Sequence, residues 1–234
     1  MNYAIIAAGE GSRLAKEGIA KPKPLVDLNG EPMIGRLINL FLRCNAESIS
    51  IIVNEEMTEV RSYLESLTLP VPFNLVVKST PSSLHSFYEL SRVMPAGKFC
   101  LTTVDTIFRE NDFRAYIKAA EAATDCDGMM AVTDYIDDEK PLYVDTDAEM
   151  NITAFRDARY DGARYISGGI YALGGRAVGV LEECMEKGIS RMRNFQRALV
   201  DAGLRLKAYP MGKILDVDHA EDIRKAEEFI NGTD

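Results

Sequence analysis

The feature that most constrains this chain is a short glycine-containing loop directly after its first apolar stretch. Residues 3–8 form an apolar run of strand length, and residues 9–13 read G-E-G-S-R. Two glycines let backbone N–H groups approach phosphate oxygens closely, and the planar guanidinium of Arg13 can donate two parallel hydrogen bonds to a phosphate. Three lysines follow within the next ten residues, the last of them Lys23. The loop therefore predicts an anion-binding turn at the end of a β-strand.

Two common phosphate-binding motifs do not match this loop. The dinucleotide fingerprint G-x-G-x-x-G needs a third glycine, but Leu14 stands at that position. The Walker A motif needs G-K-[ST], and this triplet is absent from the sequence. The alternative is a tight β-turn with incidental basic residues, which the clustering of positive charge at residues 13–23 disfavours, because the chain as a whole carries a formal net charge of -9.

Residues 7–34 resemble a known enzyme family. The stretch A-A-G-x-G-S-R-L at residues 7–14 is followed by K-P-K-P-L-V at 21–26 and G-E-P-M-I at 30–34. The same elements recur in this order in sugar-phosphate nucleotidyltransferases and their choline-phosphate cytidylyltransferase relatives. The resemblance implies a GT-A-like fold of the nucleotide-diphospho-sugar transferase type, whose glycine loop wraps an NTP. It assigns catalytic roles to Arg13 and Lys23, and nucleotide binding to Ala8, Gly9, Gly11 and Ser12.

In the first half of the chain, apolar runs of strand length alternate with segments of helical period. This alternation is typical of βαβ units, which build a mainly parallel sheet. The expected strands are residues 3–8, 49–53, 73–77 and 98–104, and the expected helices begin at Pro32, Glu55 and Ser82.

The second half is richer in strands, which implies a mixed sheet or an added β-layer. No repeat or linker interrupts the 234 residues. We therefore expect a single Rossmann-like α/β domain with a mixed, mainly parallel central sheet, comprising a nucleotide-binding half (1–110) and an acceptor-binding half with a closing helix (111–234). The segments expected there are strands at 128–133, 142–145, 152–155 and 165–173, helices at 177–187 and 191–202, a strand at 205–209 and a final amphipathic helix through Phe229.

Two aspartates are candidate ligands of Mg²⁺, which prefers carboxylate, phosphate and water oxygens. Asp105 follows the apolar strand at 98–104, and ligands of open α/β sheets bind at the carboxyl ends of strands. The resemblance makes Asp105 one metal ligand and Asp216, in D-V-D-H-A-E-D-I, the second. Asp218 could replace Asp216 or cap the final helix, with Glu221 at the spacing of a capping box. For Asp105 the alternative is a cap of the helix expected near 111–123 or of a turn.

The base and acceptor sites are predicted from weaker matches. Residues 79–85, S-T-P-S-S-L-H, stand where the family has a turn that touches base and sugar. Thr80 and Ser83 are therefore nucleotide-binding candidates, with His85 as a further one, although Thr80 could equally cap a helix with Pro81 at its first position.

The segment I-S-G-G-I-Y at 166–171 resembles the family strand that borders the acceptor, which implies substrate contacts at Gly168 and Gly169. Arg156, in F-R-D, stands near the position of a phosphate-binding lysine in hexose-phosphate enzymes. An arginine could bind a phosphate with two parallel hydrogen bonds, although arginine and lysine are not equivalent. Arg156 is therefore the third acceptor-binding candidate.

Composition excludes several other classes of protein. The net charge of -9 disfavours binding to nucleic acid or anionic membranes, which normally needs a basic face. The four cysteines form no C-x-x-C pair, so neither zinc nor a disulfide framework is indicated. The first residues lack the basic region of a signal peptide, and no apolar run is long enough to span a bilayer. We therefore expect a cytoplasmic protein whose partners are an NTP and a small phosphorylated acceptor.

Together these features predict an Mg²⁺-dependent nucleotidyltransferase that transfers NMP from an NTP to a sugar 1-phosphate or similar small phosphate ester and releases pyrophosphate. Two alternatives remain open at this point. The chain could be a non-catalytic nucleotide- or sugar-binding homologue, because its acceptor motifs depart from the family pattern. It could also be a glycosyltransferase that uses a nucleotide-sugar donor and the D-x-D sequence at 216–218.

Overall fold

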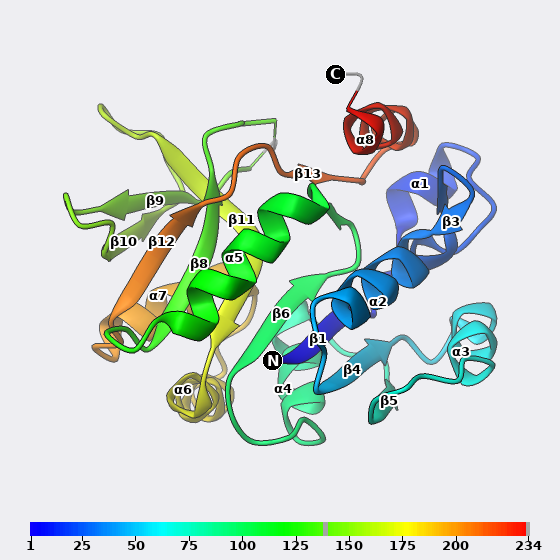
Figure 1. Ribbon diagram of the computed structural model, residues 1–234, viewed down its shortest axis with the longest axis horizontal. Helices are drawn as coiled ribbons and strands as arrows, with labels where there is room; N and C mark the ends of the chain where they lie inside the picture. The colour runs from blue at the N-terminus through cyan, green and yellow to red at the C-terminus, as the bar shows by residue number, and fades with distance from the viewer. Residues whose placement is uncertain (138–139, 233–234) are drawn as a thin grey trace.

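Strand β1 (Asn2–Ala7) is buried on both faces and lies at the centre of the fold (Figure 1). The computed structural model describes residues 1–137 and 140–232. Tyr3 and Ile5 belong to one hydrophobic core, whereas Ala4 and Ile6 belong to another on the opposite face. Because successive side chains of a strand point to opposite faces, a strand buried on both faces needs apolar residues along its length, and β1 is apolar from Tyr3 to Ala7. The sheet must therefore be covered on both sides.

One mixed sheet runs through the described residues and contains nine strands. Its main path is β10-β9-β11-β6-β1-β4-β5, and β8 and β12 continue from the other edge of β11. Strands β6, β1, β4 and β5 are parallel, while β6, β8 and β9 are all antiparallel to β11. Since β12 is parallel to β8 and β10 antiparallel to β9, only β10 and β11 oppose the other seven. The predicted mixed, mainly parallel sheet is confirmed. The other eight strands of this sheet are β4 (Ser48–Val53), β5 (Phe73–Val77), β6 (Phe99–Thr103), β8 (Gly128–Thr133), β9 (Tyr143–Thr146), β10 (Ile152–Arg156), β11 (Tyr165–Leu173) and β12 (Leu206–Pro210).

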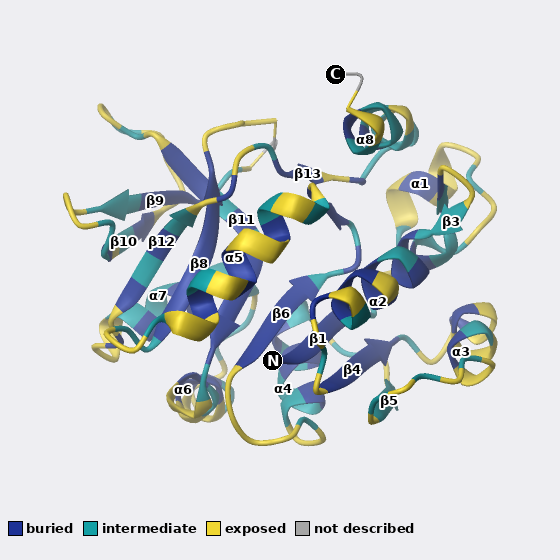
Figure 2. Ribbon diagram, in the orientation of Figure 1, coloured by how far each residue is buried: buried dark blue, intermediate teal, exposed yellow. Residues whose placement is uncertain are grey.

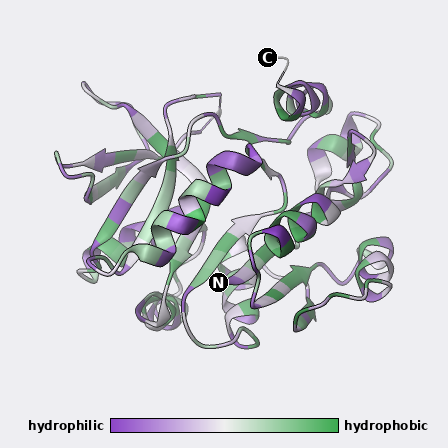
Figure 3. Ribbon diagram, in the orientation of Figure 1, coloured by the Kyte–Doolittle hydropathy of each residue, from purple (hydrophilic) through white to green (hydrophobic). Residues whose placement is uncertain are grey.

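Helices cover both faces of this sheet, as β1 requires. Figure 2 shows buried inner sides and exposed outer sides on α2 and α5, and Figure 3 shows apolar and polar residues alternating along them. This pattern is that of surface helices with one apolar stripe. The core of one face includes α2 (Met33–Arg43), α3 (Thr58–Glu65), α5 (Glu110–Ala122) and α8 (Ala220–Asn231), and that of the other includes α4 (Ser83–Ser91), α6 (Gly175–Glu186) and α7 (Met192–Asp201).

A cluster of aromatic rings fixes α2 and α5 against the sheet. Tyr3 stacks on Phe41 of α2 with ring centroids 4.3 Å apart, and Phe108 stacks on Phe113 of α5 at 4.8 Å. The buried hydroxyl of Tyr116 donates to the carbonyl of Met129 at 2.7 Å and accepts from the N–H of Ala172 at 2.8 Å. Because Phe108 follows the end of β6 by only a few residues, this cluster also holds the segment after β6 in place.

The long elements agree with the sequence prediction to within a few residues, whereas short ones were not predicted. These short elements owe their form to tertiary contacts rather than to periodicity. No helix in residues 1–137 and 140–232 is both long and apolar enough to cross a membrane. The unpredicted elements are α1 (Ser12–Lys16), a 3₁₀ turn η1 (Lys23–Leu25), β2 (Asp27–Leu28), β3 (Glu31–Pro32), β7 (Thr106–Ile107) and β13 (Leu215–Asp216).

We predict that Phe41→Ala lowers the free energy of unfolding by about 3–5 kcal/mol, because it leaves a cavity beside Tyr3 and Phe113. Urea denaturation followed by circular dichroism measures this change. Asn39→Ala, an exposed position on the same helix, is the matched control and should change stability by no more than about 0.5 kcal/mol. Equal effects of the two substitutions would contradict this account of the aromatic cluster.

Candidate active site

A cavity of about 550 Å³ opens where several parallel strands end. Gly9 follows β1, Asn54 follows β4, Thr80 follows β5 and Asp105 follows β6, and all four line the cavity. The carboxyl ends of parallel strands meet at one edge of a sheet, which is where open α/β folds bind ligands. We call this space the loop cavity.

The glycine loop forms one wall of the loop cavity, and its two glycines serve different purposes. Gly11 has a left-handed backbone with φ of 62°, and an added Cβ would lie 2.9 Å from Cβ of Lys23. Gly9 has no atom within 4 Å of an added Cβ, so a methyl group there would meet open space. Leu14, at the position of the missing third glycine, is buried in the core and anchors α1. Ala8 and Ser12, for which nucleotide contacts are predicted, also line the loop cavity.

Lys23 lies between two carboxylates and joins the two ends of the site. Its Nζ is 2.5 Å from Oδ2 of Asp105 and 2.8 Å from Oδ1 of Asp218. Its side chain is 10% exposed. Burial alone lowers the pKa of Lys23, but the carboxylates of Asp105 and Asp218 outweigh burial and raise that pKa above its usual value. Arg13 completes the cluster, with Nη1 2.7 Å from Oδ2 of Asp218. Two predicted cations and two acidic residues thus meet in one place.

Asp216 adds a third carboxyl group to this cluster. Its strand β13 pairs with β7, and the N–H of Val217 donates to the carbonyl of Asp105 at 3.1 Å, so the main chain holds the two acidic segments together. Asp216 is exposed and lies on the wall of a cavity. Desolvation first, and then the negative charges of Asp105 and Asp218, raise the pKa of Asp216 to about 8. Asp216 is therefore mostly protonated at neutral pH, and the carboxylates of Asp105 and Asp218 are balanced by the cations of Lys23 and Arg13.

This donor set suits a hard divalent cation. Mg²⁺ prefers oxygen ligands, and the carboxyl groups of Asp105, Asp216 and Asp218 provide them. Across the described part of the chain, however, no three His, Cys, Asp or Glu side chains converge in the arrangement of a formed metal site. The ammonium group of Lys23 occupies the position between Asp105 and Asp218 instead.

Neither Asp105 nor Asp218 caps a helix, so the helix-cap alternatives for these two residues are wrong. The residue that caps α5 is Arg109, not Asp105, and the residue that caps α8 is His219, not Asp218. The carboxylate of Asp222, rather than that of Glu221, accepts from the N–H groups of Asp218 and His219, at 3.2 and 2.8 Å. The side chain of Asp218 is thereby left to face Arg13 and Lys23.

The segment after β5 lines the loop cavity with hydroxyl groups. Thr80 and Ser83 both line it, together with Ser86. Thr80 is not a helix cap, because α4 begins after Ser82, and its Oγ1 lies 2.6 Å from Oγ of Ser86. His85 is not part of the lining, and its Nδ1 contacts Oγ of Ser82 at 2.9 Å. Asn54 and Ser86 are lining residues that the sequence did not indicate.

A second cavity of about 440 Å³ adjoins the first, and Arg13 and Asp218 line both. Gly168 lies on its wall, and a Cβ there would collide with Ile214 and lie 3.1 Å from the carbonyl oxygen of Ala131. Gly169 has φ of 73° in the segment where β11 loses register with β8, and it is not among the lining residues. We call this second cavity the α8 cavity. Its other charged lining residues, which sequence patterns did not reveal, are Asp137, Lys140, Arg193, His219, Glu221, Asp222 and Lys225.

Arg156 lies away from both cavities. Its Nε is 2.6 Å from Oδ2 of Asp145, and its guanidinium lies over the ring of Tyr160 at 5.4 Å. Its predicted contact with an acceptor phosphate stays a prediction that this position does not support.

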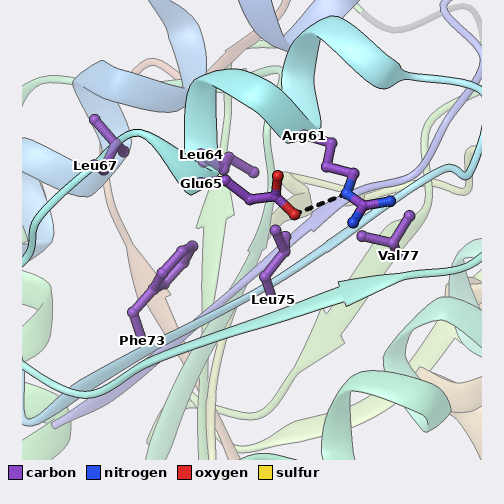
Figure 4. A pocket seen from close by; sticks show the side chains of 7 residues that line it. All are labelled: Arg61, Leu64, Glu65, Leu67, Phe73, Leu75 and Val77. Carbon is purple, nitrogen blue, oxygen red and sulfur yellow. Dashed lines mark hydrogen bonds and ion pairs between the residues drawn. The ribbon is translucent and has the colours of Figure 1, made fainter.

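A further cavity, also of about 440 Å³, lies between α3 and β5 (Figure 4). Leu64, Phe73 and Leu75 line it, and so do Arg61 and Glu65 of α3, which form an ion pair with each other. It contains none of the predicted site residues, so the candidate active site is the pair formed by the loop cavity and the α8 cavity.

Comparisons with known proteins show the family and the fold of this chain. Residues 3–173 match the family model described as MobA-like NTP transferase domain. The 2-aminoethylphosphonate cytidylyltransferase of Lancefieldella rimae is 31% identical over 113 residues, which cover 47% of this chain and only 44% of that relative. The inositol-1-phosphate CTP transferase of T. maritima superimposes with a TM-score of 0.82 at 19% identity, covering 99% of this chain and 95% of that one. A putative glucose-1-phosphate thymidylyltransferase of Bacillus anthracis gives 0.84 at 19% identity, with coverage of 98% and 95%. At these identities the two structures show a shared fold.

The two glycines of the loop allow a paired test. We predict that Gly11→Ala lowers the free energy of unfolding by at least about 1–2 kcal/mol, because a left-handed backbone disfavours a side chain and the new Cβ meets Lys23. Gly9→Ala should change stability by less than about 0.5 kcal/mol, since its Cβ meets no atom. Urea denaturation of both variants measures the difference. A Gly9 variant as unstable as the Gly11 variant would refute the distinction.

Proposed function

Because the chain belongs to the family of MobA-like NTP transferase domains, we propose that it transfers NMP from an NTP to a small phosphate ester or phosphonate and releases pyrophosphate. One observation carries this proposal. Arg13 and Lys23 meet the carboxylates of Asp105 and Asp218 at the junction of the loop cavity and the α8 cavity. One cavity can hold the triphosphate and the other the acceptor, with the reacting phosphates between them.

The proposed reaction is an in-line displacement at the α-phosphorus. An oxygen of the acceptor phosphate forms a bond to that phosphorus, the bond to the bridging β-phosphate oxygen breaks, and pyrophosphate leaves. No general base is needed, because a phosphate monoester with a second pKa of about 6 is largely dianionic at neutral pH. Arg13 and Lys23 hold the two anions and stabilise charge in the transition state. Gly9, Gly11 and Ser12 offer main-chain N–H groups to the triphosphate.

The proposal includes one Mg²⁺ ion. Asp105 and Asp216 would hold it, and Asp218 is the alternative second ligand, because all three carboxyl groups lie around Lys23. The ion would neutralise phosphate charge in the transition state. With the ion and the nucleotide both bound, Lys23 would face the phosphates rather than the carboxylates.

The comparisons suggest which substrates to test first. Two of the similar proteins are described by transfer from CTP or of a cytidylyl group, so CTP is the first donor candidate. In the α8 cavity, Asp137, Glu221 and Asp222 surround the single ammonium of Lys225 at 4.0, 2.9 and 3.2 Å. The same cavity is also lined by the cations Arg13, Lys140 and Arg193, so charges of both signs surround it, and 2-aminoethylphosphonate, which carries both an anionic group and an amino group, is the first acceptor candidate.

Pyrophosphate release tests the proposal directly. The four NTPs, each with Mg²⁺, would be combined with 2-aminoethylphosphonate, phosphocholine, inositol 1-phosphate and glucose 1-phosphate. We expect acceptor-dependent pyrophosphate with at least one pair. Nucleotide binding without pyrophosphate from any pair would instead identify a non-catalytic homologue, and turnover of a nucleotide sugar without an NTP would identify a glycosyltransferase.

We predict that Asp105→Asn and Lys23→Ala each reduce turnover by at least about 100-fold, because each removes a charge that faces the reacting phosphates. Circular dichroism should show an unchanged fold. Lys21→Ala is the matched control, because Lys21 is 56% exposed, pairs with Asp27 and lines neither cavity. Turnover within about threefold of wild type in either site variant would remove these assignments.

We also place the enzyme in the cytoplasm, where NTPs are available. The four cysteines support a reducing location, because all are free and three are buried. A role in making nucleotide-activated sugars or alcohols follows from the reaction itself.

A further inference from the structure

We infer that Lys23 and Arg13 block the metal carboxylates until a triphosphate draws them away, so that a divalent ion binds tightly only together with the nucleotide. This inference rests on the proposed function, because it concerns the metal and the NTP of the same site. It adds an order to binding that neither the fold nor the family relationship contains.

Two of the three carboxyl groups that suit a metal, those of Asp105 and Asp218, are already paired with cations in this structure. Lys23 bridges Asp105 and Asp218, and Arg13 contacts the second oxygen of Asp218. Both oxygens of Asp218 are therefore engaged, and one oxygen of Asp105 is too. A divalent ion beside these groups would repel an ammonium that is only 10% exposed and has little solvent to screen it. Metal and Lys23 thus compete for the same oxygens.

The carboxylates are the fixed partners of these ion pairs, and the cations are the movable ones. Main-chain bonds hold the acidic segments, since Val217 donates to Asp105 and the N–H of Asp218 donates to Asp222. Arg13, in contrast, is 53% exposed, and a lysine ammonium is carried on a flexible four-carbon stem. An exchange of partners would therefore move Arg13 and Lys23 and leave the aspartates in place.

A destination for both cations exists next to the carboxylates. Lys23 and Arg13 also line the loop cavity, and Cβ of Lys23 packs against Gly11 of the glycine loop. A triphosphate held by this loop would offer several negative oxygens within reach of both side chains. Nucleotide binding would then free the oxygens of Asp105 and Asp218 for the metal, and each ligand would strengthen the binding of the other.

Mn²⁺ binding to nucleotide-free protein tests the inference, with free Mn²⁺ measured by electron paramagnetic resonance. Lys23→Met should bind Mn²⁺ about tenfold more tightly than wild type, which corresponds to about 1.4 kcal/mol. Lys21→Met removes the same charge two residues away without touching the cluster, so its Mn²⁺ affinity should equal that of wild type. Equal affinity in the Lys23 variant and wild type, or an equal gain in both variants, would overturn the inference.

A measurement on the wild type covers the case in which Lys23→Met does not fold. The ammonium resonance of Lys23 would be followed by NMR, with inorganic tripolyphosphate added in the presence of EDTA. A changed resonance without metal supports the exchange, because the phosphates then take the ammonium from its carboxylates. An unchanged resonance with tripolyphosphate bound overturns it.

A separate measurement shows which proposal fails. Wild type should bind Mn²⁺ in the presence of α,β-methylene-CTP, and Asp105→Asn should not. If no Mn²⁺ binds in that complex, the proposed metal site is wrong, and the inference falls with it. If Mn²⁺ binds there but binds equally well without the nucleotide, the metal site stands and only the inference is overturned.

Discussion

The position of Lys23 between Asp105 and Asp218 is the interaction on which the rest of the site depends. The three residues come from the 3₁₀ turn η1 that follows α1, the end of β6 and the segment before α8, so they meet only when the sheet and α8 are both in place. A nearly buried ammonium requires compensating charge, since an isolated buried charge is strongly disfavoured. Folding thus brings the residues proposed to bind phosphate and those proposed to bind the metal into one contact, and this contact lies where the two cavities meet.

Supporting contacts around this cluster explain how its carboxylates keep their positions. Pairing of β13 with β7 places Asp216 beside Thr106, and the stacking of Phe108 on Phe113 holds that segment on α5. On the other side, Glu17 joins α1 to α8, because its carboxylate accepts from the N–H of Ala220 at 2.6 Å and contacts the ring of His219 at 2.6 Å. The glycine loop and the closing helix are therefore linked directly, in addition to the ion pairs of Arg13 and Lys23.

The sequence was sufficient for the elements whose signals are local. Buried strands such as β1 and β11 were predicted from apolar runs, and the loop at residues 9–13 from its glycines and charges. The α8 cavity was not predictable in the same way, because Arg193, Glu221 and Lys225 look like ordinary surface charges until tertiary structure brings them together. Gln196 is a similar case. It is buried and joins Ser167 to Tyr171 through its side-chain amide, a role that no spacing in the sequence reveals. The helix caps considered at Asp218 and Thr80 were wrong for another reason. A shift of one or two residues in the start of α8 or α4 changes which side chain caps the helix and which faces the cavity.

The charge of the whole chain raises the question of how an acidic protein can hold a polyanion. A net charge of -9 repels anions at long range, but salt screens that repulsion beyond about 8–10 Å, and local groups then decide binding. The local cations Arg13 and Lys23 are not free, because acidic side chains already neutralise them. A simple phosphate would have to displace those partners while offering little charge in return. Under the proposed function, a triphosphate that arrives with a divalent ion would replace both sides of each ion pair at once, giving the cations phosphate oxygens and the carboxylates a metal. The self-neutralised site would therefore favour a metal-bound nucleotide over the smaller anions around it.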